Sequence, residues 1–533
     1  MSLVTGNGPR FSPSGPSGST PRELKEHPEL AAIRPAAVGQ FFADFCNRPC
    51  KAGGEEIVIA KLVEFAELHG FEYARDDHRN LAIYVPGRGK GTEAAPVALQ
   101  FHTDMVFYPE HHDFSGLGIS LESNTLADGE TVISSGGTTT IGADNRLGAS
   151  IALALAIDDQ LADRPPLVLL ATSAEEIGLV GAKELKSEML RGSQFLINLD
   201  NEKLGHVFNR CAGQATGAIS MPLERTGIDE SVRSDYRPIL VKVMNLPGGH
   251  SGAEIHERRG NAITTLAQAL GSVIQDESGQ PLRVGSLAGG EARNAIPSGA
   301  SAVLWIHKDE AAATIEQLER RAMAIIEATV DPVFFKSGKP PRVEIEDLSE
   351  SAIRSHLPEP ISPSDARALL GMLNTLKHGV LEDDEHQNPE LSNNVAQILQ
   401  RGQGLEVVCM TRHFDEDRCV ESLTSQFDAL APLNASLALR LRSTSAGWYG
   451  GDSYRLLSVA CEAYREVSGD EAIVSGIHAG VEPGEFNKIA PNMQQVSLGP
   501  TILGAHSSEE RFIVGTVEVC YNQVAKMLEM LCE

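Results

Sequence analysis

The sequence lacks any apolar run of about 18 residues, the length at which a membrane-spanning helix is recognised. Its N-terminus also lacks the charged and then apolar segments of a secretory signal. Basic residues are scarce, because 45 Lys and Arg stand against 72 Asp and Glu, a formal net charge of −27. Nucleic acids and anionic membranes bind surfaces rich in Lys and Arg, so we expect neither as a partner.

Cysteine is sparse, with 8 residues in a chain of 533. This usage does not indicate a disulfide framework, and Cys46 and Cys50 lack the second pair that a zinc knuckle needs. We therefore expect a soluble, cytoplasmic protein with reduced thiols that is not exported. The apolar content (42%) and charged content (22%) are those of an ordinary globular protein. The length allows roughly two to four domains.

The order of strand-like and helix-like segments predicts the fold class. Residues 1–29 are rich in Gly, Pro and Ser at their start, and we expect a disordered leader there. From residue 30 to 205, the strand-like segments "NLAIYV", "PVALQF", "PLVLLAT" and "QFLINLD" alternate with the helical segments "LGASIALALAI" and "GAKELKSEML". This alternation is typical of a doubly wound α/β domain, in which helices cover both faces of a mainly parallel sheet.

The pattern changes after Asp200. Amphipathic helices such as "AITTLAQALGSVI" and "TIEQLERRAMAIIEATV" lie between short alternating strands such as "PILVKVMNL". This pattern predicts an antiparallel sheet with helices on one face. The α/β pattern returns near residue 445, so we predict one discontinuous α/β domain, residues 30–205 and 445–533, with an α+β domain, residues 206–444, inserted in it. No repeat is obvious, although two similar halves within the insert remain open.

Metal-ligand residue types follow the ends of several predicted strands. In open α/β sheets, ligands bind outside the carboxyl ends of the strands, and several strands deliver side chains to that edge. The candidates are His102 and Asp104 in "LQFHTDMV", Asp144 in "TIGADNRLG", Glu175 and Glu176 in "SAEEIG", Asp200 in "LINLDNE", and His506 in "LGAHSSEE".

Each candidate also has an ordinary structural explanation. A single His-x-Asp pair is usually a surface feature, and adjacent glutamates are usually a solvated turn. Asp144 could cap the following helix, and Asp200 could end a strand as a turn residue. His506 alone indicates only a loop. Together, however, these motifs at one sheet edge favour a metal site over independent coincidences.

A two-metal site would use these residues in defined roles. Two divalent ions about 3.5–4 Å apart need a bridging carboxylate and further ligands on each side. We predict that Asp144 bridges. The remaining ligands are His102 and Asp200 for one ion, and Glu176 and His506 for the other.

Two carboxylates remain beside this ligand set. Asp104 would accept a hydrogen bond from the second ring nitrogen of His102 and fix its orientation. Glu175 would act as the general base towards a metal-bridging water or hydroxide. Histidine and carboxylate ligands without a thiolate suit zinc, manganese or cobalt better than calcium or copper. We expect two divalent ions, with zinc as the first candidate.

Specific motifs run from about Ala36 to the C-terminus. They are "LQFHTDMV", "GTTTIGADNRLGASIALALA", "SAEEIGLVGA", "LINLDNE", "LPGGHSGAEIHERRGNA", "EARNAIPSGA", "HAGVEPGEF" and "SLGPTILGAHSSEERF". With them the chain resembles the aminoacyl-histidine dipeptidases, a branch of the di-zinc metallopeptidases related to aminoacylase and carboxypeptidase G. The resemblance implies the same metal ligands, Glu175 as the base, an inserted lid domain that closes over a peptide, and a homodimer as a common assembly.

The resemblance also implies roles for residues of the insert. His250, in "GGHSG", would donate to the carbonyl oxygen as it becomes tetrahedral, although the motif alone indicates a flexible loop with a structural histidine. Glu482 in "HAGVE" could pair with a free substrate amine. Candidates for the substrate carboxylate, which could instead be surface or capping residues, are Asn261, Arg293, Asn294 and Arg412.

Some positions depart from the family pattern. Arg146 stands close to Asp144 where the family usually has glycine, and could alter the mouth of the pocket. His413 follows Arg412 in place of a small polar residue, and the segment after "HTDMV" lacks the usual polar-basic run. These departures bear on substrate preference, because every predicted metal ligand is present.

We therefore expect a metal-dependent dipeptidase that hydrolyses Xaa-His or similar small unblocked dipeptides through a metal-bridging hydroxide. An amidohydrolase of the same architecture, which removes an N-acyl group or a C-terminal residue, is the near alternative. A non-catalytic binding protein with this fold is the remote alternative, and the presence of Glu175 beside a full ligand set argues against it.

Overall fold

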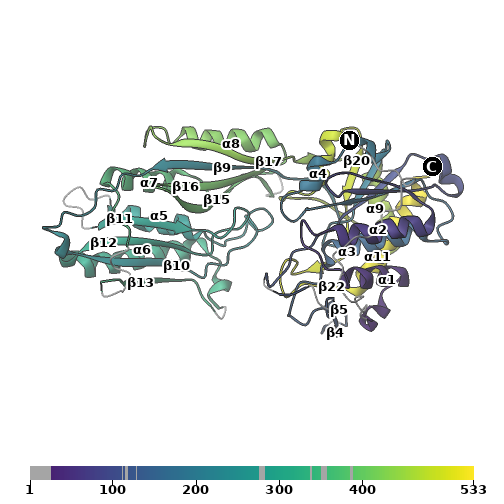
Figure 1. Ribbon diagram of the computed structural model, residues 1–533, viewed down its shortest axis with the longest axis horizontal. Helices are drawn as coiled ribbons and strands as arrows, with labels where there is room; N and C mark the ends of the chain where they lie inside the picture. The colour runs from purple at the N-terminus through teal and green to yellow at the C-terminus, as the bar shows by residue number, and fades with distance from the viewer. Residues whose placement is uncertain are drawn as a thin grey trace, which may run out of the picture. The chain divides into compact units, whose positions relative to one another are not determined.

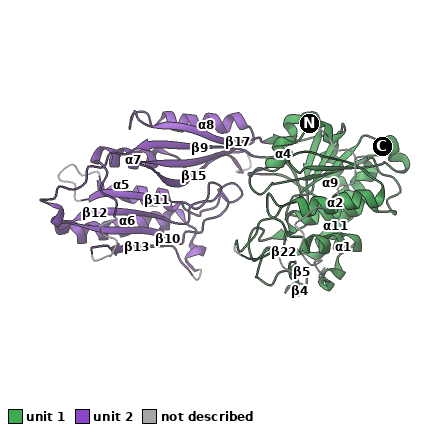
Figure 2. Ribbon diagram, viewed as in Figure 1, with its two compact units in different colours: residues 1–211, 448–476, 481–533 green, residues 212–447, 477–480 purple. Residues whose placement is uncertain are grey.

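The computed structural model describes residues 26–532 apart from residues 111, 115–117, 128, 275–281, 337–338, 350–356 and 385–387. The chain divides into two compact units (Figure 2). Unit 1 comprises Met1–Cys211, Trp448–Gly476 and Val481–Glu533, and unit 2 comprises Ala212–Gly447 and Ile477–Gly480. Residues 1–25 of the predicted leader lie outside the described residues, and Pro28–Ala32 form a short 3-10 helix, η1. None of the described helices has the length and apolarity needed to cross a membrane.

Unit 1 is built on a mixed sheet in the order β1-β2-β6-β3-β7-β20-β8-β18, with β19 paired to β8. The central strands β6, β3, β7 and β20 run parallel, whereas the strands towards both edges pair antiparallel. The strands are β1 (Glu72–Arg75), β2 (Leu81–Val85), β3 (Val97–His102), β6 (Leu167–Thr172), β7 (Phe195–Asn198), β8 (His206–Cys211), β18 (Trp448–Tyr449), β19 (Ile473–Ile477) and β20 (Gln494–Ser497).

Helices cover both faces of this sheet (Figure 1). Side chains alternate along each strand, so that in β3 Leu99 belongs to one core and Ala98 to the other. The first core contains α1 (Ala36–Cys46), α2 (Glu56–His69), α3 (Ala143–Ile157), α9 (Arg455–Ser468) and α11 (Val514–Met530). The second contains α4 (Val180–Glu184), η3 (Ser187–Leu190) and α10 (Pro483–Ile489). The predicted α/β class, with a sheet covered on both faces, is confirmed.

A smaller sheet in unit 1 has the order β21-β22-β5-β4. Its strands are β4 (Glu122–Thr125), β5 (Thr131–Ser134), β21 (Ile502–Leu503) and β22 (Arg511–Ile513), and η2 (Gly89–Glu93) lies between β2 and β3. Because β22 pairs with β5, the chain on either side of His506 is anchored beside the segment that leads into α3.

The segment "GAKELKSEML" is not the single helix that its periodicity predicts. Helix α4 ends at Glu184, and Leu185 and Lys186 are extended before η3 begins. Leu185, Met189 and Leu190 are all buried in the second core. The break allows both short helices to bury apolar side chains against the sheet, and tertiary packing here overrides local helix propensity.

Unit 2 is an antiparallel sheet in the order β13-β10-β12-β11-β15-β16-β9-β17, with β14 paired to β15. The apolar sides of its four helices, α5 to α8, share one core with the sheet, as the predicted α+β class requires. Its elements are β9 (Gly213–Pro222), η4 (Arg233–Asp235), β10 (Tyr236–Met244), α5 (Ala262–Ile274), β11 (Leu282–Gly289), β12 (Ala300–His307), η5 (Lys308–Glu310), α6 (Ala311–Thr329), η6 (Pro332–Lys336), β13 (Arg342–Asp347), α7 (Pro363–Thr375), β14 (Gly379–Asp383), β15 (Pro389–Arg401), β16 (Gly404–His413), α8 (Glu416–Asp428) and β17 (Ala438–Ser445).

Apart from β14, which lies between α7 and β15, the strands and α-helices of unit 2 form two repeats of the same β-α-β-β-α-β order. One repeat is β10-α5-β11-β12-α6-β13, and it is inserted after the first strand of the other, β9-α7-β15-β16-α8-β17. Read from its outer edge inwards, each repeat places its fourth, first, third and second strands in that order. The two second strands, β11 and β15, pair antiparallel where the repeats meet. The similar halves that the sequence left open are therefore present as repeated topology.

Candidate metal centre

Adjacent parallel strands of unit 1 deliver the predicted ligands to one sheet edge. His102 is the last residue of β3 and lies in register with Thr172, the last residue of β6. Glu175 and Glu176 follow β6, and Asp200 follows β7, which pairs with the other side of β3. Asp144 lies in the first turn of α3, and His506 lies between β21 and β22.

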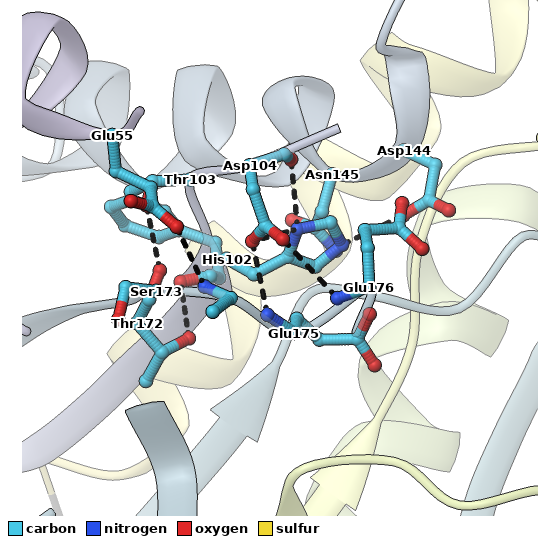
Figure 3. A network of polar contacts seen from close by, with 12 residues as sticks. Glu55, His102, Thr103, Asp104, Asp144, Asn145, Thr172, Ser173, Glu175 and Glu176 are labelled. Carbon is cyan, nitrogen blue, oxygen red and sulfur yellow. Dashed lines mark hydrogen bonds and ion pairs between the residues drawn. The ribbon is translucent and has the colours of Figure 1, made fainter. Parts of the chain in front are cut away.

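The carboxylate of Asp144 stands between the two histidines. Its Oδ1 lies 2.9 Å from His102 Nε2, and its Oδ2 lies 3.1 Å from His506 Nε2. A second carboxylate accompanies each histidine: Asp200 Oδ1 is 3.4 Å from His102 Nε2, and Glu176 Oε2 is 3.0 Å from His506 Nε2. The side chains of Asp144, His102 and Glu176 point towards one another in Figure 3. The structure thus brings all five predicted ligands together.

The electrostatics of this cluster fit divalent cations. One ligand atom from each of His102, Asp144 and Glu176 lies within 4.8 Å of the others, a spacing at which ligand groups can hold metal ions. Burial raises the pKa of Glu176, and the nearby charge of Asp144 raises it further. The Oε1 atom of Glu176 is buried and has no hydrogen-bond partner among the described residues. Such a carboxylate oxygen is available to a cation.

Burial opposes the positive charge of His506, but Asp144 and Glu176 outweigh it and raise the pKa of His506 to about 12. Because imidazole must be neutral to bind a metal, metal binding at this site releases protons.

Glu175 lies beside the cluster, but its carboxylate points in a different direction from that of Glu176 (Figure 3). Burial raises its pKa well above the usual range, and the charge of Glu176 raises it further, although His102 opposes both. A carboxylate with a raised pKa next to a metal site is well suited to accept a proton from water.

The carboxylate of Asp104 holds the turn that carries the two glutamates. Its two oxygens accept hydrogen bonds from the backbone N–H groups of Glu175 (3.1 Å) and Glu176 (3.2 Å). His102 Nδ1 is closer to the backbone oxygen of Asp104 (3.0 Å) than to its carboxylate (3.6 Å). The fixed orientation that we predicted for the imidazole thus involves the backbone of Asp104 as well as its side chain.

Glu55 is a neighbour of the site that the sequence did not reveal. It is fully buried, and its Oε1 accepts a hydrogen bond from the backbone N–H of Ala174 at 3.0 Å. Its Oε2 pairs with Arg79 Nε at 3.0 Å. In the sequence Glu55 precedes a helical segment, where a solvated glutamate is the ordinary expectation.

Glu482 is fully buried in unit 1. Its Oε2 accepts hydrogen bonds from Thr172 Oγ1 (2.9 Å) and from Gln100 Nε2, whereas Oε1 has no partner in the part of the chain that the structure describes. Burial raises the pKa of Glu482 to about 8. A buried carboxyl group with one unpaired oxygen favours a cationic neighbour.

The remaining predicted residues belong to unit 2. His250 Nδ1 accepts hydrogen bonds from the backbone N–H groups of Gly252 (3.3 Å) and Ala253 (3.0 Å). An accepting Nδ1 places the proton of the neutral ring on Nε2. The neutral His250 ring therefore carries its proton on Nε2, which is compatible with the donor role that stays a prediction.

Arg412 is buried, with 3% of its surface exposed. Its Nε has no hydrogen-bond partner within the described ranges, and burial lowers its pKa to about 10. Gly252 lies against it: an added Cβ would collide with the carbonyl oxygen of His478 and lie 3.0 Å from Arg412 Nε and 3.1 Å from His250 Cε1. Because Gly252 has no Cβ, the side chains of His250 and Arg412 and the carbonyl group of His478 can lie close to it.

The other candidates for the substrate carboxylate differ in their surroundings. Asn261 is buried as the cap of α5, because its Oδ1 accepts from the N–H groups of Ile263 (2.9 Å) and Thr264 (3.2 Å). Its Nδ2 donates to the backbone oxygen of Val395 at 2.9 Å. Arg293 is half-buried and Asn294 is exposed.

Arg146 does not lie at the mouth of a pocket, so that expectation was wrong. It is buried, and its guanidinium donates to the backbone oxygens of Phe45 (3.0 Å) and Arg48 (3.3 Å). Its side chain therefore joins the start of α3 to the end of α1. Every described cysteine is free, and Cys50 Sγ lies 3.6 Å from the Arg146 guanidinium.

Comparison with known proteins finds dipeptidases that are similar to almost the whole chain. The peptidase dimerisation domain of the M20 group matches residues 242–332. The cytosol non-specific dipeptidase of Escherichia coli (strain K12) is 28% identical over 512 residues, which cover 94% of this chain and 99% of the relative. The crystal structure of aminoacylhistidine dipeptidase from Vibrio alginolyticus matches with a TM-score of 0.73 and 26% identity, over 94% of this chain and 98% of that one. These matches confirm the resemblance predicted from the motifs: over almost its whole length the chain is similar to dipeptidases of the M20 group.

Proposed function

We propose that this protein is a metal-dependent dipeptidase that hydrolyses small unblocked dipeptides, Xaa-His among them. The relatives named above are dipeptidases, and they match almost the whole chain. The observation that carries the proposal is the position of Asp144, whose two carboxylate oxygens each face a different histidine. This is the arrangement that a carboxylate bridging two metal ions requires.

The cofactors would be two divalent cations, zinc first, with manganese or cobalt as alternatives. One ion would be held by His102 and Asp200, the other by Glu176 and His506, and Asp144 would be shared. When bound, such ions lower the pKa of a coordinated water and polarise the scissile carbonyl group.

Glu175 would move the proton during hydrolysis. Its carboxylate takes a proton from the attacking water and passes it to the nitrogen of the leaving amine. His250 would donate from Nε2 to the carbonyl oxygen as negative charge develops there. Asp104 supports this chemistry by holding the turn from which the Glu175 side chain projects.

Two buried charged groups would recognise the ends of the substrate. Glu482, with an unpaired oxygen, suits the free α-amino group. Arg412, with an unpaired Nε, suits the C-terminal carboxylate, and Arg293 and Asn294 would have accessory roles. Asn261 would act through the fold of unit 2, because its side chain already caps α5.

The test is a panel of dipeptides, each offered with a free and with an N-acetylated amine, before and after chelation. We expect cleavage of the free-amine forms, no cleavage of the acetylated forms, and loss of activity on chelation. The reverse preference would favour the amidohydrolase alternative, and no cleavage of any member would favour a binding protein.

We also propose a homodimer, because the matched domain is one used for dimerisation. In this chain β11 of that domain already pairs with β15 of the second repeat. A second copy would therefore bind through another surface. Light scattering on the purified protein measures the assembly, and a monomeric mass would contradict the dimer.

A further inference from the structure

Glu510 is a buried carboxylate that the proposed chemistry does not use. Only 2% of its surface is exposed, although it lies in the irregular segment between β21 and β22. A carboxylate is seldom buried without compensating partners. Its partners are backbone N–H groups of a segment more than 360 residues away in the sequence, so its burial has a specific structural cause.

Four successive backbone N–H groups converge on this carboxylate. Its Oε2 accepts from Ile141 (2.6 Å) and Gly142 (3.1 Å). Its Oε1 accepts from Ala143 (2.7 Å) and Asp144 (3.4 Å). The first N–H groups of a helix have no partner within the helix and carry partial positive charge, so a carboxylate satisfies them well.

This contact fixes the backbone directly before the Asp144 side chain. Gly142 adopts a left-handed conformation (φ 68°, ψ 32°), and an added Cβ would lie 2.9 Å from Met105 Sδ. The turn therefore has little freedom once Glu510 holds its N–H groups. The position of the Asp144 carboxylate between the two histidines depends on that turn.

Glu510 also joins two parts of the metal centre. It follows His506 by four residues, and its own backbone N–H donates to the oxygen of Ser507 at 3.2 Å. The segment that carries His506 is thereby tied to the segment that carries Asp144, and these two ligands lie 3.1 Å apart. A change at Glu510 would act on two of the three ligands proposed for that ion.

We propose that Glu510 is a positioning residue that sets the geometry of the metal pair through the backbone of Ile141–Asp144. The inference rests on the proposed metal site. Glu510 would not contact the metal or the substrate; it would act through Asp144 and His506. Removal of a group that orients metal ligands typically weakens metal binding by about 10- to 100-fold.

The experiment titrates the metal-free full chain with Co²⁺ and follows the visible absorption bands, which report the ligand geometry. Glu510→Asp keeps the charge but shortens the side chain, and Glu510→Gln keeps the length but replaces one acceptor with a donor. The matched control is Glu509→Gln, because Glu509 is the exposed neighbour of Glu510. Circular dichroism of each metal-free variant monitors the fold.

We expect both Glu510 variants to bind one Co²⁺ at least tenfold more weakly with shifted bands, and Glu509→Gln to match the wild type. Wild-type affinity and bands in Glu510→Asp would overturn the inference, because charge alone would then suffice. Loss of the fold in both Glu510 variants would also overturn it, because Glu510 would then support the fold as a whole. A wild-type protein that binds no Co²⁺ would instead refute the proposed function.

Discussion

The two units differ in which buried groups have shifted pKa values. In unit 1, burial raises the pKa of Glu175, Glu176 and Asp200, because these carboxylates lie close together in a low-dielectric surrounding. In unit 2, burial lowers the pKa of Arg412 to about 10 and that of His478 to about 3. The shifts in unit 1 fit the cation site proposed there, and the buried guanidinium of Arg412 fits the proposed binding of an anion in unit 2. In the proposed metal-dependent dipeptidase, metal ions would bind in unit 1 and the substrate carboxylate would bind in unit 2.

The largest effect should come from Glu175→Gln in unit 1. Loss of a general base should reduce kcat by about a thousandfold. The metal content should stay at the wild-type level, because Glu175 is outside the proposed ligand set. Steady-state kinetics and elemental analysis measure the two quantities, and exposed Glu184→Gln is the control. A variant with kcat within tenfold of the wild type would contradict the base assignment.

In unit 2, Arg412→Met should mainly raise KM, by about a hundredfold for dipeptides with a free carboxylate. The fold should remain stable, because the variant removes a buried cation that forms no ion pair among the described residues. Dipeptide amides, which lack the free carboxylate, are measured with the wild type and with Arg412→Met. The amides should bind the wild type weakly, and the variant should raise their KM little further. A full additional loss with the amides would show that Arg412 does not bind the carboxylate. Exposed Arg418→Met is the control.

His506→Ala tests the cation site without touching the base. This variant should lose one of the two ions, with affinity reduced by about 10- to 100-fold or more, because a direct ligand matters at least as much as its supports. Dialysis against a range of free zinc concentrations followed by metal analysis gives the stoichiometry. Full occupancy at wild-type affinity would remove His506 from the ligand set.

The smallest effect concerns acid stability in unit 2. His478 is held neutral in the folded chain, so the unfolded chain binds an extra proton as the pH falls below about 6.5. Stability should therefore fall with decreasing pH, by about 2 kcal/mol for this group between pH 6.5 and 5. Urea unfolding of the metal-free protein should show this slope, and His478→Gln should reduce it. An unchanged slope in the variant would contradict the assignment.

The sequence predicted the convergence of ligands because parallel strands have a simple rule. His102, Glu176 and Asp200 follow three strands that turn out to be neighbours in the sheet, so their carboxyl ends meet. The alternation of strands and helices likewise predicted the covered sheet of unit 1. Both predictions depend on short-range patterns that every residue of a strand or helix helps to form.

What the sequence could not show depends on contacts between distant segments. Glu55 and Glu510 act on backbone N–H groups, which every residue type provides, so no motif marks the partner. The break at Leu185 arises from packing against the sheet rather than from local propensity. The two repeats of unit 2 share an order of elements. Because many apolar sequences satisfy the same topology, this shared order leaves no residue pattern to recognise. One repeat is also inserted within the other, which hides the period.

The central claim is that the clustered carboxylates and histidines of unit 1 are a two-metal site bridged by Asp144. Zinc titration of the metal-free wild type and of Asp144→Asn, followed by calorimetry and metal analysis, tests it most directly. We predict two zinc ions per wild-type chain, with release of protons, and weakened binding of both ions in the variant, because the shared ligand serves both. Two zinc ions bound to Asp144→Asn at wild-type affinity would contradict the account.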